Sequence, residues 1–179
     1  MTRTANRKNR PEARAPRIVA IPVFQQLQSL DAVGPAQVFG SANQQLGREA
    51  YRVRFIASTP GNISTSAGFA LHADSLKSVT PASVDTLVCP GGEEAPIRDA
   101  LRDRKLMAWI GATASAARRA CSVCSGAFLL AGTGLLEGRR AATHWASTAE
   151  LQRLHPGVSV DPEAIFVTDG KFWTSAGVT

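Results

Sequence analysis

Short apolar runs rich in β-branched residues alternate along the chain with longer segments whose apolar positions recur at helical spacing. The runs predict strands, which we place at residues 17–24, 51–58, 84–89, 118–124, 164–169 and 171–177. The longer segments predict helices, which we place at residues 29–47, 96–116, 125–136 and 147–154. A Gly-, Ser- and Thr-rich stretch at residues 59–76 predicts a hairpin-like excursion between two strands.

Three residues mark the expected boundaries of the first helix. Asp31 and Pro35 are both typical of a helix start, and Gly47 is typical of a residue that ends a helix. The later segment 125–136 is apolar almost all round, which is the pattern of a buried helix.

This alternation of strands and helices predicts an α/β fold, with a mostly parallel sheet between helices on both faces. Ligands of such sheets bind beyond the carboxyl ends of the strands. Two loops directly follow predicted strands, Cys-Pro-Gly-Gly-Glu-Glu at residues 89–94 and Cys-Ser-Gly at residues 124–126. We therefore expect the functional site at these two loops.

The net charge of +6 comes mostly from one end of the chain. Residues 1–17 contain six Arg or Lys side chains and one Glu, so the remaining residues are almost neutral. Such a segment is typical of a disordered tail, with weak phosphate binding as the alternative. We interpret residues 1–16 as a disordered basic tail and residues 17–179 as one domain.

The composition predicts a cytoplasmic protein. No apolar run reaches the roughly 18 residues of a membrane helix, and the first residues lack the apolar core of a secretory signal. The chain has three cysteines, which is a poor basis for a disulfide framework, so a reducing compartment is expected. No membrane association, metal or cofactor is expected.

The turn at Cys124 carries the strongest chemical signal. A predicted strand delivers Cys124 directly into an apolar helix, and Ser125 and Gly126 are small enough for the sharp, strained turn that this requires. Amides at a helix start favour an anion, so the pKa of the thiol should lie well below the free value of about 8.5. Cys124 is thus a candidate nucleophile or ligand-sensing thiol, with a plain core position as the alternative.

Other interpretations of the cysteines are weaker. Cys121 lies at the spacing of a redox pair with Cys124, but it should sit inside the strand, where it cannot easily reach Cys124. A zinc site would need about four ligands, and the histidines of the chain are scattered. Cys89 and Cys121 fit buried core positions, and Cys89 could also line the site.

Four further residues are candidates for the site. Gly91 and Gly92 place flexible amides at a strand end, which suits an oxyanion or carboxylate, although a tight turn explains them equally well. His144, in the segment ATHWAS, follows a further short strand that we expect there, and it is either catalytic or simply packed. Asp31 either caps its helix or exchanges a proton with Cys124, in which case the pKa of its carboxyl should be raised.

The chain resembles the ThiJ/PfpI family, part of the class I glutamine amidotransferase-like superfamily, in the segments RIVAIPVF…SLDAVGPAQVF, DTLVCPGG, CSVCSGAFLLAGTGLLEGRRAATHW and FWTSAGVT. The resemblance covers about residues 17–179 and implies a flavodoxin-like, three-layer fold. Within the family, the chain is most similar to the amino-terminal domain of AraC-type transcriptional regulators. Because that domain is thought to sense a small-molecule ligand or to mediate dimerisation, the resemblance implies a ligand and a homodimer.

The family pattern assigns roles to the candidate residues. The catalytic candidates are Cys124, Asp31 and His144, and the ligand-binding candidates are Gly91, Gly92, Ser125 and Gly126. Peptidases and glyoxalase-like enzymes of the family carry a histidine where this chain has Ser125, which weakens a protease interpretation. The pairing of Asp31 with Cys124 instead resembles isonitrile hydratases, in which the thiolate attacks the isonitrile carbon.

The family's long apolar helix after the last motif, and a helix-turn-helix region, are both missing from the sequence. We therefore expect uncovered apolar surface and DNA binding only through a carboxyl-terminal domain that this sequence does not contain. The favoured function is a ligand-sensing and dimerisation domain of an AraC-type regulator. A cysteine-dependent hydratase or amidase, and a stress-responsive protein that senses oxidation at Cys124, are the alternatives.

Overall fold

A computed structural model describes residues 15–177 and contains an eight-stranded sheet in the order β3-β4-β2-β1-β5-β6-β10-β9. The strands of this sheet are β1 Arg17–Pro22, β2 Tyr51–Ala57, β3 Gly61–Ser64, β4 Ala70–Ser75, β5 Val84–Cys89, β6 Arg119–Val123, β9 Phe166–Asp169 and β10 Phe172–Ser175. The six inner strands pair in parallel, whereas the outermost strands β3 and β9 pair antiparallel with their neighbours. The expected α/β fold with a mostly parallel sheet is confirmed.

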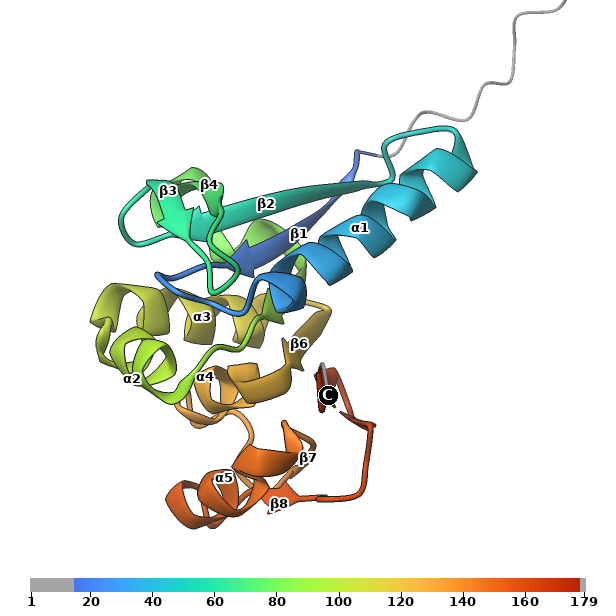
Figure 1. Ribbon diagram of the computed structural model, residues 1–179. Helices are drawn as coiled ribbons and strands as arrows, with labels where there is room; N and C mark the ends of the chain where they lie inside the picture. Colours follow the sequence, from blue (N-terminus) through green and yellow to red (C-terminus); the bar gives the residue numbers. More distant parts are fainter. Residues whose placement is uncertain (1–14, 178–179) are drawn as a thin grey trace, which may run out of the picture.

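Helices cover both faces of this sheet (Figure 1). They are α1 Ser29–Leu46, α2 Glu94–Arg102, α3 Arg104–Ala116, α4 Ala127–Ala131 and α5 Thr148–Leu154. Helix α1 packs on one face against β2 and β5, and α3 and α4 pack together on the other, with α2 beside them. A separate parallel pair, β7 Arg140–Ala141 and β8 Ser159–Val160, lies near α5. Within residues 15–177, no helix is long and apolar enough to cross a bilayer.

The core lies along the central strands. Val19, Ala20 and Ile21 of β1 are completely buried, as is Leu87 of β5, because helices cover these strands on both sides. Strands buried on both faces read as continuous apolar runs, which is why their positions could be predicted from the sequence. The carboxyl ends of these strands point to one edge of the sheet, where the loops 89–94 and 124–126 lie.

The first helix begins at Ser29, as expected. Pro35, interpreted as a residue of the helix start, instead lies inside α1, where it has no amide N–H to donate to the preceding turn. Gly47 follows the helix with a left-handed φ of 61° and donates its amide N–H to carbonyls of the last turn, as expected of a helix stop.

The expected single helix at residues 96–116 is two helices. Asp103 separates α2 from α3, and its carboxylate accepts hydrogen bonds from the amides of Lys105 and Leu106, each at 3.0 Å. An aspartate that caps the second helix favours this break over a continuous helix.

The expected helix at residues 125–136 is much shorter. Residues Cys124–Gly126 form a 3₁₀ turn, and α4 then continues for only five residues. Gly134 adopts a left-handed φ of 78°, and the Thr133 hydroxyl donates to the carbonyl of Leu130 at 2.6 Å, which together end the helical path. Residues 125–131 are buried, as the composition predicts, but Gly132 and Gly134 are exposed and the segment after α4 is mostly turn.

Two expectations remain, the hairpin at residues 59–76 and the basic tail, and the structure describes the first but almost none of the second. The excursion at residues 59–76 is a hairpin of β3 and β4 with antiparallel pairing, as expected. The predicted basic tail falls almost entirely on residues 1–14, which lie outside the described residues.

Candidate functional site around Cys124

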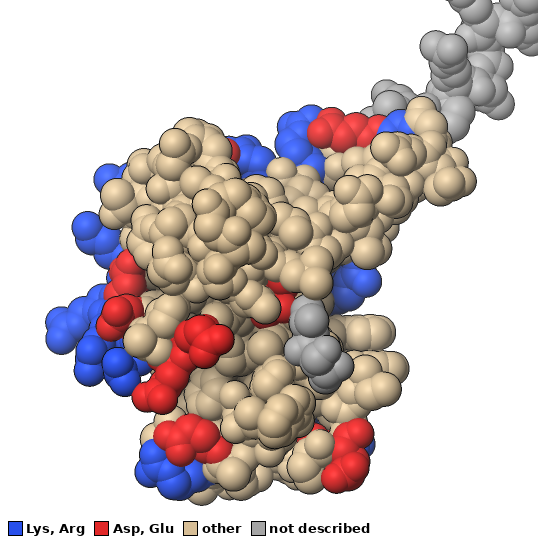
Figure 2. All heavy atoms as spheres, viewed as in Figure 1, with Lys and Arg blue, Asp and Glu red and all other residues tan. Residues whose placement is uncertain are grey.

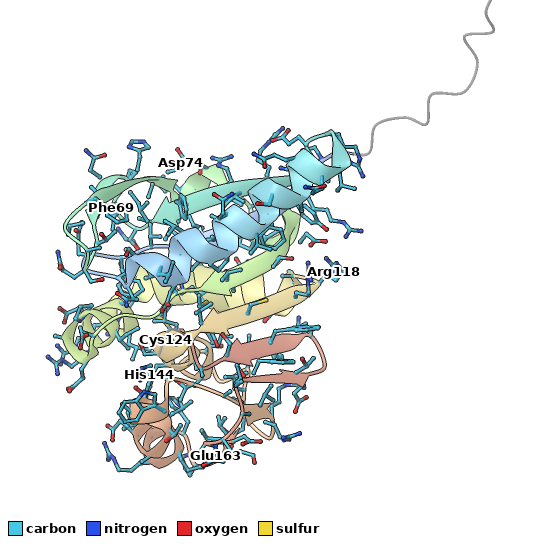
Figure 3. The ribbon with its side chains drawn as sticks, turned by 45° about the vertical axis from the view of Figure 1, so that its right-hand side comes forward. Phe69, Asp74, Arg118, Cys124, His144 and Glu163 are labelled. Carbon is cyan, nitrogen blue, oxygen red and sulfur yellow. The ribbon has the colours of Figure 1, made fainter. Side chains whose placement is uncertain are left out.

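Cys124 occupies a strained turn between β6 and the 3₁₀ turn that leads into α4. Its φ is 57°, in the left-handed region that a side chain rarely adopts. Gly126 makes the turn possible, because a Cβ there would lie 2.2 Å from the carbonyl oxygen of Cys89 at the end of β5. The strained, crowded turn inferred from the small residues is therefore present, and Figure 3 shows Cys124 at the end of β6 with His144 on a neighbouring segment.

Asp31 lies in the first turn of α1 and is brought against this turn. It is 1% exposed, and its Oδ2 accepts a hydrogen bond from the amide of Gly91 at 3.0 Å. The carboxyl also lies close enough to the Cys124 thiol that each group shifts the pKa of the other. Its other oxygen, Oδ1, is buried and has no conventional hydrogen-bond donor among residues 15–177.

The environment of Asp31 disfavours its charge. Burial raises the pKa of its carboxyl, and the hydrogen bond from Gly91, the thiol of Cys124 and the nearby His144 only partly oppose that effect. The raised pKa of Asp31 agrees with the expectation for a carboxyl that shares a site with a thiol.

The expected low pKa of Cys124 is wrong. Burial, followed by the charge of Asp31, raises the pKa of the thiol to about 11, and the amide and hydroxyl of Ser125 lower it only in part. The helix behind the thiol is five residues long, so it supplies little of the dipole on which the sequence argument relied. The Cys124 thiol is therefore protonated at neutral pH.

The amides of Gly91 and Gly92 are already engaged. Gly91 donates to Asp31, and Gly92 donates to the hydroxyl oxygen of Ser125 at 2.9 Å. The same hydroxyl donates to the carbonyl oxygen of Gly92 at 2.7 Å, so Ser125 ties the two loops together. In this conformation neither amide points a free N–H at a ligand, and the ligand-binding roles of these glycines, of Ser125 and of Gly126 remain predictions.

His144 lies near the pair without bonding to it. Its Nδ1 accepts the amide of Ala146 at 3.3 Å and so caps a short turn, and its ring lies 5.4 Å from that of Trp145. Its charge influences Asp31, but among the described contacts its ring makes no hydrogen bond to Asp31 or Cys124. A catalytic role for His144 therefore also remains a prediction.

Two residues of the site were missed from the sequence. Thr143 is buried, and its hydroxyl donates to the carbonyl oxygen of Cys124 at 2.9 Å, which fixes the strained peptide. Gly177 has a φ of 85°, and a Cβ there would lie 2.5 Å from the Cβ of Cys124. The signal for Gly177 in the sequence was a glycine at the end of a predicted strand, whereas nothing in the sequence distinguishes Thr143.

The other cysteines are not part of this cluster. All three thiols are free; Cys89 is fully buried, and burial raises its pKa strongly. Cys121 lies within β6, as expected, and burial raises its pKa to about 11. Within residues 15–177 there is no group of three or more His, Cys, Asp or Glu side chains placed to hold a metal ion.

Comparisons with known proteins place this geometry in a family. The DJ-1/PfpI family model matches residues 17–179. A ThiJ/PfpI family protein from Pseudomonas syringae has a similar structure, with a TM-score of 0.79 at 26% identity over 91% of this chain and 63% of its own.

Three curated relatives show the range of proteins to which the chain is similar. An uncharacterised protein from Streptomyces lividans is 40% identical over 79% of this chain and 96% of its own length. An isonitrile hydratase from Pseudomonas putida is 30% identical over 88% of this chain, which spans 64% of the hydratase. The HTH-type transcriptional regulator GbdR from Pseudomonas aeruginosa is 26% identical over 93% of this chain, which spans 44% of the regulator. The strained cysteine turn, the buried acid beside it and these matches together show that the chain belongs to the DJ-1/PfpI family.

Proposed function

We propose that the chain is a ligand-sensing and dimerisation domain of an AraC-type transcriptional regulator. The observation that carries the proposal is the partly buried position of Cys124 beside the buried carboxyl of Asp31, because burial and the charge of Asp31 raise the pKa of the thiol to about 11. A protonated thiol is a weak nucleophile, and the neighbouring amides of Gly91 and Gly92 are occupied by protein groups. Such a site is better suited to binding than to turnover.

The relatives support this proposal at the level of the family. The chain spans 44% of the HTH-type regulator from Pseudomonas aeruginosa, and the proposal assigns DNA recognition in a regulator of this kind to the part that this chain does not match. Residues 18–179 carry nearly balanced charge, which agrees with a domain that binds a small molecule rather than DNA. A cytoplasmic location is part of the same proposal.

A cysteine-dependent hydratase is the second candidate, and the contact between Asp31 and Cys124 favours it. In that reaction Asp31 takes the thiol proton while the sulfur bonds to the isonitrile carbon, and that carbon receives the proton to give a thioimidate. Water then adds to the same carbon, and the C–S bond breaks to release an N-substituted formamide and the free thiol. Oxidation sensing is disfavoured, because peroxide reacts with the thiolate rather than with a protonated thiol.

Turnover of a simple alkyl isonitrile separates the two candidates. We expect the wild-type protein to form no more N-alkylformamide than the Cys124→Ala variant, because the thiol is not ionised. Formamide production that requires both Cys124 and Asp31 would reject the sensing proposal in favour of the hydratase. The Cys121→Ala variant is the matched control, since its thiol lies outside the site.

A further inference from the structure

The segment between β1 and α1 holds a second strained residue. Gln26 has a φ of 61°, and Gln26 and Cys124 are the two non-glycine residues with a positive φ among residues 15–177. A side chain keeps this conformation only where the surrounding contacts impose it, and such positions concentrate at functional sites. The contacts of Gln26 therefore indicate what the fold holds in place here.

Ser64, the last residue of β3, makes the contacts that hold Gln26. The carbonyl oxygen of Ser64 accepts the amide N–H of Gln26 at 2.8 Å, and its hydroxyl oxygen accepts Nε2 of Gln26 at 2.9 Å. The amide and the hydroxyl of Ser64 both donate to Oε1 of Gln25, at 3.0 and 2.6 Å. All three polar groups of Ser64 therefore bond to the loop that follows β1.

The same loop continues to the cysteine site. Leu27 is completely buried and forms bridges both to Thr65 of the β3–β4 hairpin and to Gly92. Next to it, the amide of Gln28 donates to the carbonyl oxygen of Gly91 at 2.9 Å. The loop after β1 is thus held between the β3–β4 hairpin on one side and the loop after β5 on the other.

These contacts fix Asp31 relative to Gly91. Helix α1 begins at the residue after Gln28, and the amide of Asp31 donates to the carbonyl oxygen of Gln28 at 3.2 Å. The carboxyl of Asp31 in turn accepts the amide N–H of Gly91 at 3.0 Å. Both Gln28 and Asp31 therefore rest on Gly91, and the carboxyl is held close to the Cys124 thiol.

We propose that Ser64 is a positioning residue for the cysteine site: it holds the loop before α1 in its strained path and thereby keeps the Asp31 carboxyl beside Cys124. Its described side-chain hydrogen bonds go to Gln25 and Gln26, so it acts on the site through the loop. The inference deepens the proposed sensing role, and it rests on that role only in taking Cys124 as the functional group.

The contact between the hairpin and the loop is made without charge. Residues 23–28 and 59–73 contain no Lys, Arg, Asp or Glu, and Figure 2 shows a mostly uncharged surface over β3 and β4. The titratable groups around the Cys124 thiol are Asp31 and, beyond it, His144. A neutral substitution at Ser64 leaves both unchanged, so a shift in the ionisation of Cys124 must come from a change in position.

The pH dependence of Cys124 alkylation by iodoacetamide tests this role in the full chain. Ser64→Ala removes the hydroxyl contacts of the loop, so Asp31 can move away from the thiol and water can approach it. We expect the profile to move to lower pH by about half a unit, which makes the reaction about threefold faster at a fixed pH below the pKa. Ser64→Thr keeps the hydroxyl and should restore the wild-type profile.

The matched control is Ser83→Ala, because the hydroxyl of Ser83 is exposed and donates to the carbonyl oxygen of Thr80 at 2.7 Å, within its own short turn. This variant also loses a serine hydroxyl and its hydrogen bond. Its Cys124 profile should be the same as that of the wild-type protein.

A second variant breaks the same contact from the side of the loop. Gln25 is exposed, so Gln25→Leu should fold as the wild type does, and it removes the acceptor of the Ser64 amide and hydroxyl. We expect it to move the Cys124 profile in the same direction. The double variant should move the profile no further than the larger single shift, because the two residues belong to one hydrogen-bond network.

Two results would overturn the inference. One is a wild-type Cys124 profile in either Ser64→Ala or Gln25→Leu, even if urea unfolding shows a loss of stability, because the role would then be purely structural. The other is a shift in Ser64→Ala that Ser64→Thr does not reverse. Circular dichroism checks that each variant is folded, and if Ser64→Ala does not fold, Gln25→Leu alone decides. The sensing proposal fails separately, through formamide production by the wild-type protein.

Discussion

The protonation states of Asp31 and Cys124 decide the chemistry of the site. Burial raises the pKa of Asp31 in the folded chain, so this carboxyl binds its proton more tightly there than in the unfolded chain. From the unfolded pKa near 3.8 up to the raised folded pKa, the folded state therefore holds more protons. Its stability falls as the pH rises through that window.

Replacing Asp31 by asparagine should remove this cost. At pH 7 we expect Asp31→Asn to raise the free energy of unfolding by on the order of 1 kcal/mol, and the gain should vanish at a pH below the unfolded pKa. Urea unfolding at both pH values measures the difference. The control variant is Asp99→Asn, because the side chain of Asp99 is 74% exposed, and its free energy of unfolding should be close to that of the wild-type protein. A variant that is less stable than wild type at pH 7 would show that the ionised carboxylate stabilises the fold.

Gly177 should control access to the thiol. Its left-handed φ and its close approach to Cys124 mean that Gly177→Ala cannot be accommodated without displacing the segment after β10. We expect this variant to increase the rate at which Cys124 reacts with a neutral thiol reagent by at least several-fold. Gly40→Ala, where a Cβ meets no atom within 4 Å, should leave that rate unchanged. Equal rates in both variants would mean that Gly177 does not shield the sulfur.

The sequence was informative about the position of these residues but not about their protonation. The small residues Ser125 and Gly126 predict the sharp turn at Cys124, and the position of Asp31 at the start of the first helix allows it to lie near that turn. The pKa values depend on how deeply both groups are buried and on which amides they bond. Those quantities arise from contacts between Asp31 and the loop at Gly91, 60 residues apart in the chain.

Among the helices, the capping residue Asp103 makes the clearest quantitative prediction. Partial burial opposes its ionisation, but the nearby Ser58 hydroxyl and the hydrogen bonds from the amides of Leu106 and Lys105 outweigh burial and lower its pKa. Asp103→Ala should reduce the free energy of unfolding by about 1 kcal/mol, as loss of a helix cap usually does. Asp99→Ala in α2, which caps no helix, provides the comparison.

The sign of the pH dependence gives a second check on Asp103. Because the pKa of Asp103 is lower in the folded chain than in the unfolded chain, its ionised carboxylate stabilises the protein at every pH above the unfolded pKa. This contribution is lost as the pH falls through the folded pKa. The deficit of Asp103→Ala should therefore be full at pH 7 and shrink in acid. A deficit that is constant across that range would indicate that packing, rather than the charged cap, holds the helix break.

Elements were easier to predict than their ends. Residues 18–22 of β1 and 87–89 of β5 are continuous apolar runs, and that pattern follows directly from burial on both faces. The break at Asp103 was missed because apolar residues keep helical spacing on both sides of it. The short α4 was missed because apolar composition indicates burial but does not distinguish a helix from a buried turn.

Across the whole molecule, the order of the strands could not be read from the sequence. Alternation of strands and helices predicted a parallel sheet, but the insertion of β10 between β6 and β9 brings Gly177 to Cys124, and it depends on tertiary packing.

The ionisation of Cys124 tests the central claim most directly, and the pH dependence of its alkylation by iodoacetamide, followed by peptide mass spectrometry, measures it. We predict slow reaction at pH 7 and a rate that climbs toward about pH 11, with the rise displaced to lower pH in Asp31→Asn. Cys121, whose pKa burial also raises to about 11, should keep the same profile in both proteins. A wild-type thiol that ionises below about pH 8.5, the free value, or a slower reaction in Asp31→Asn, would contradict the account.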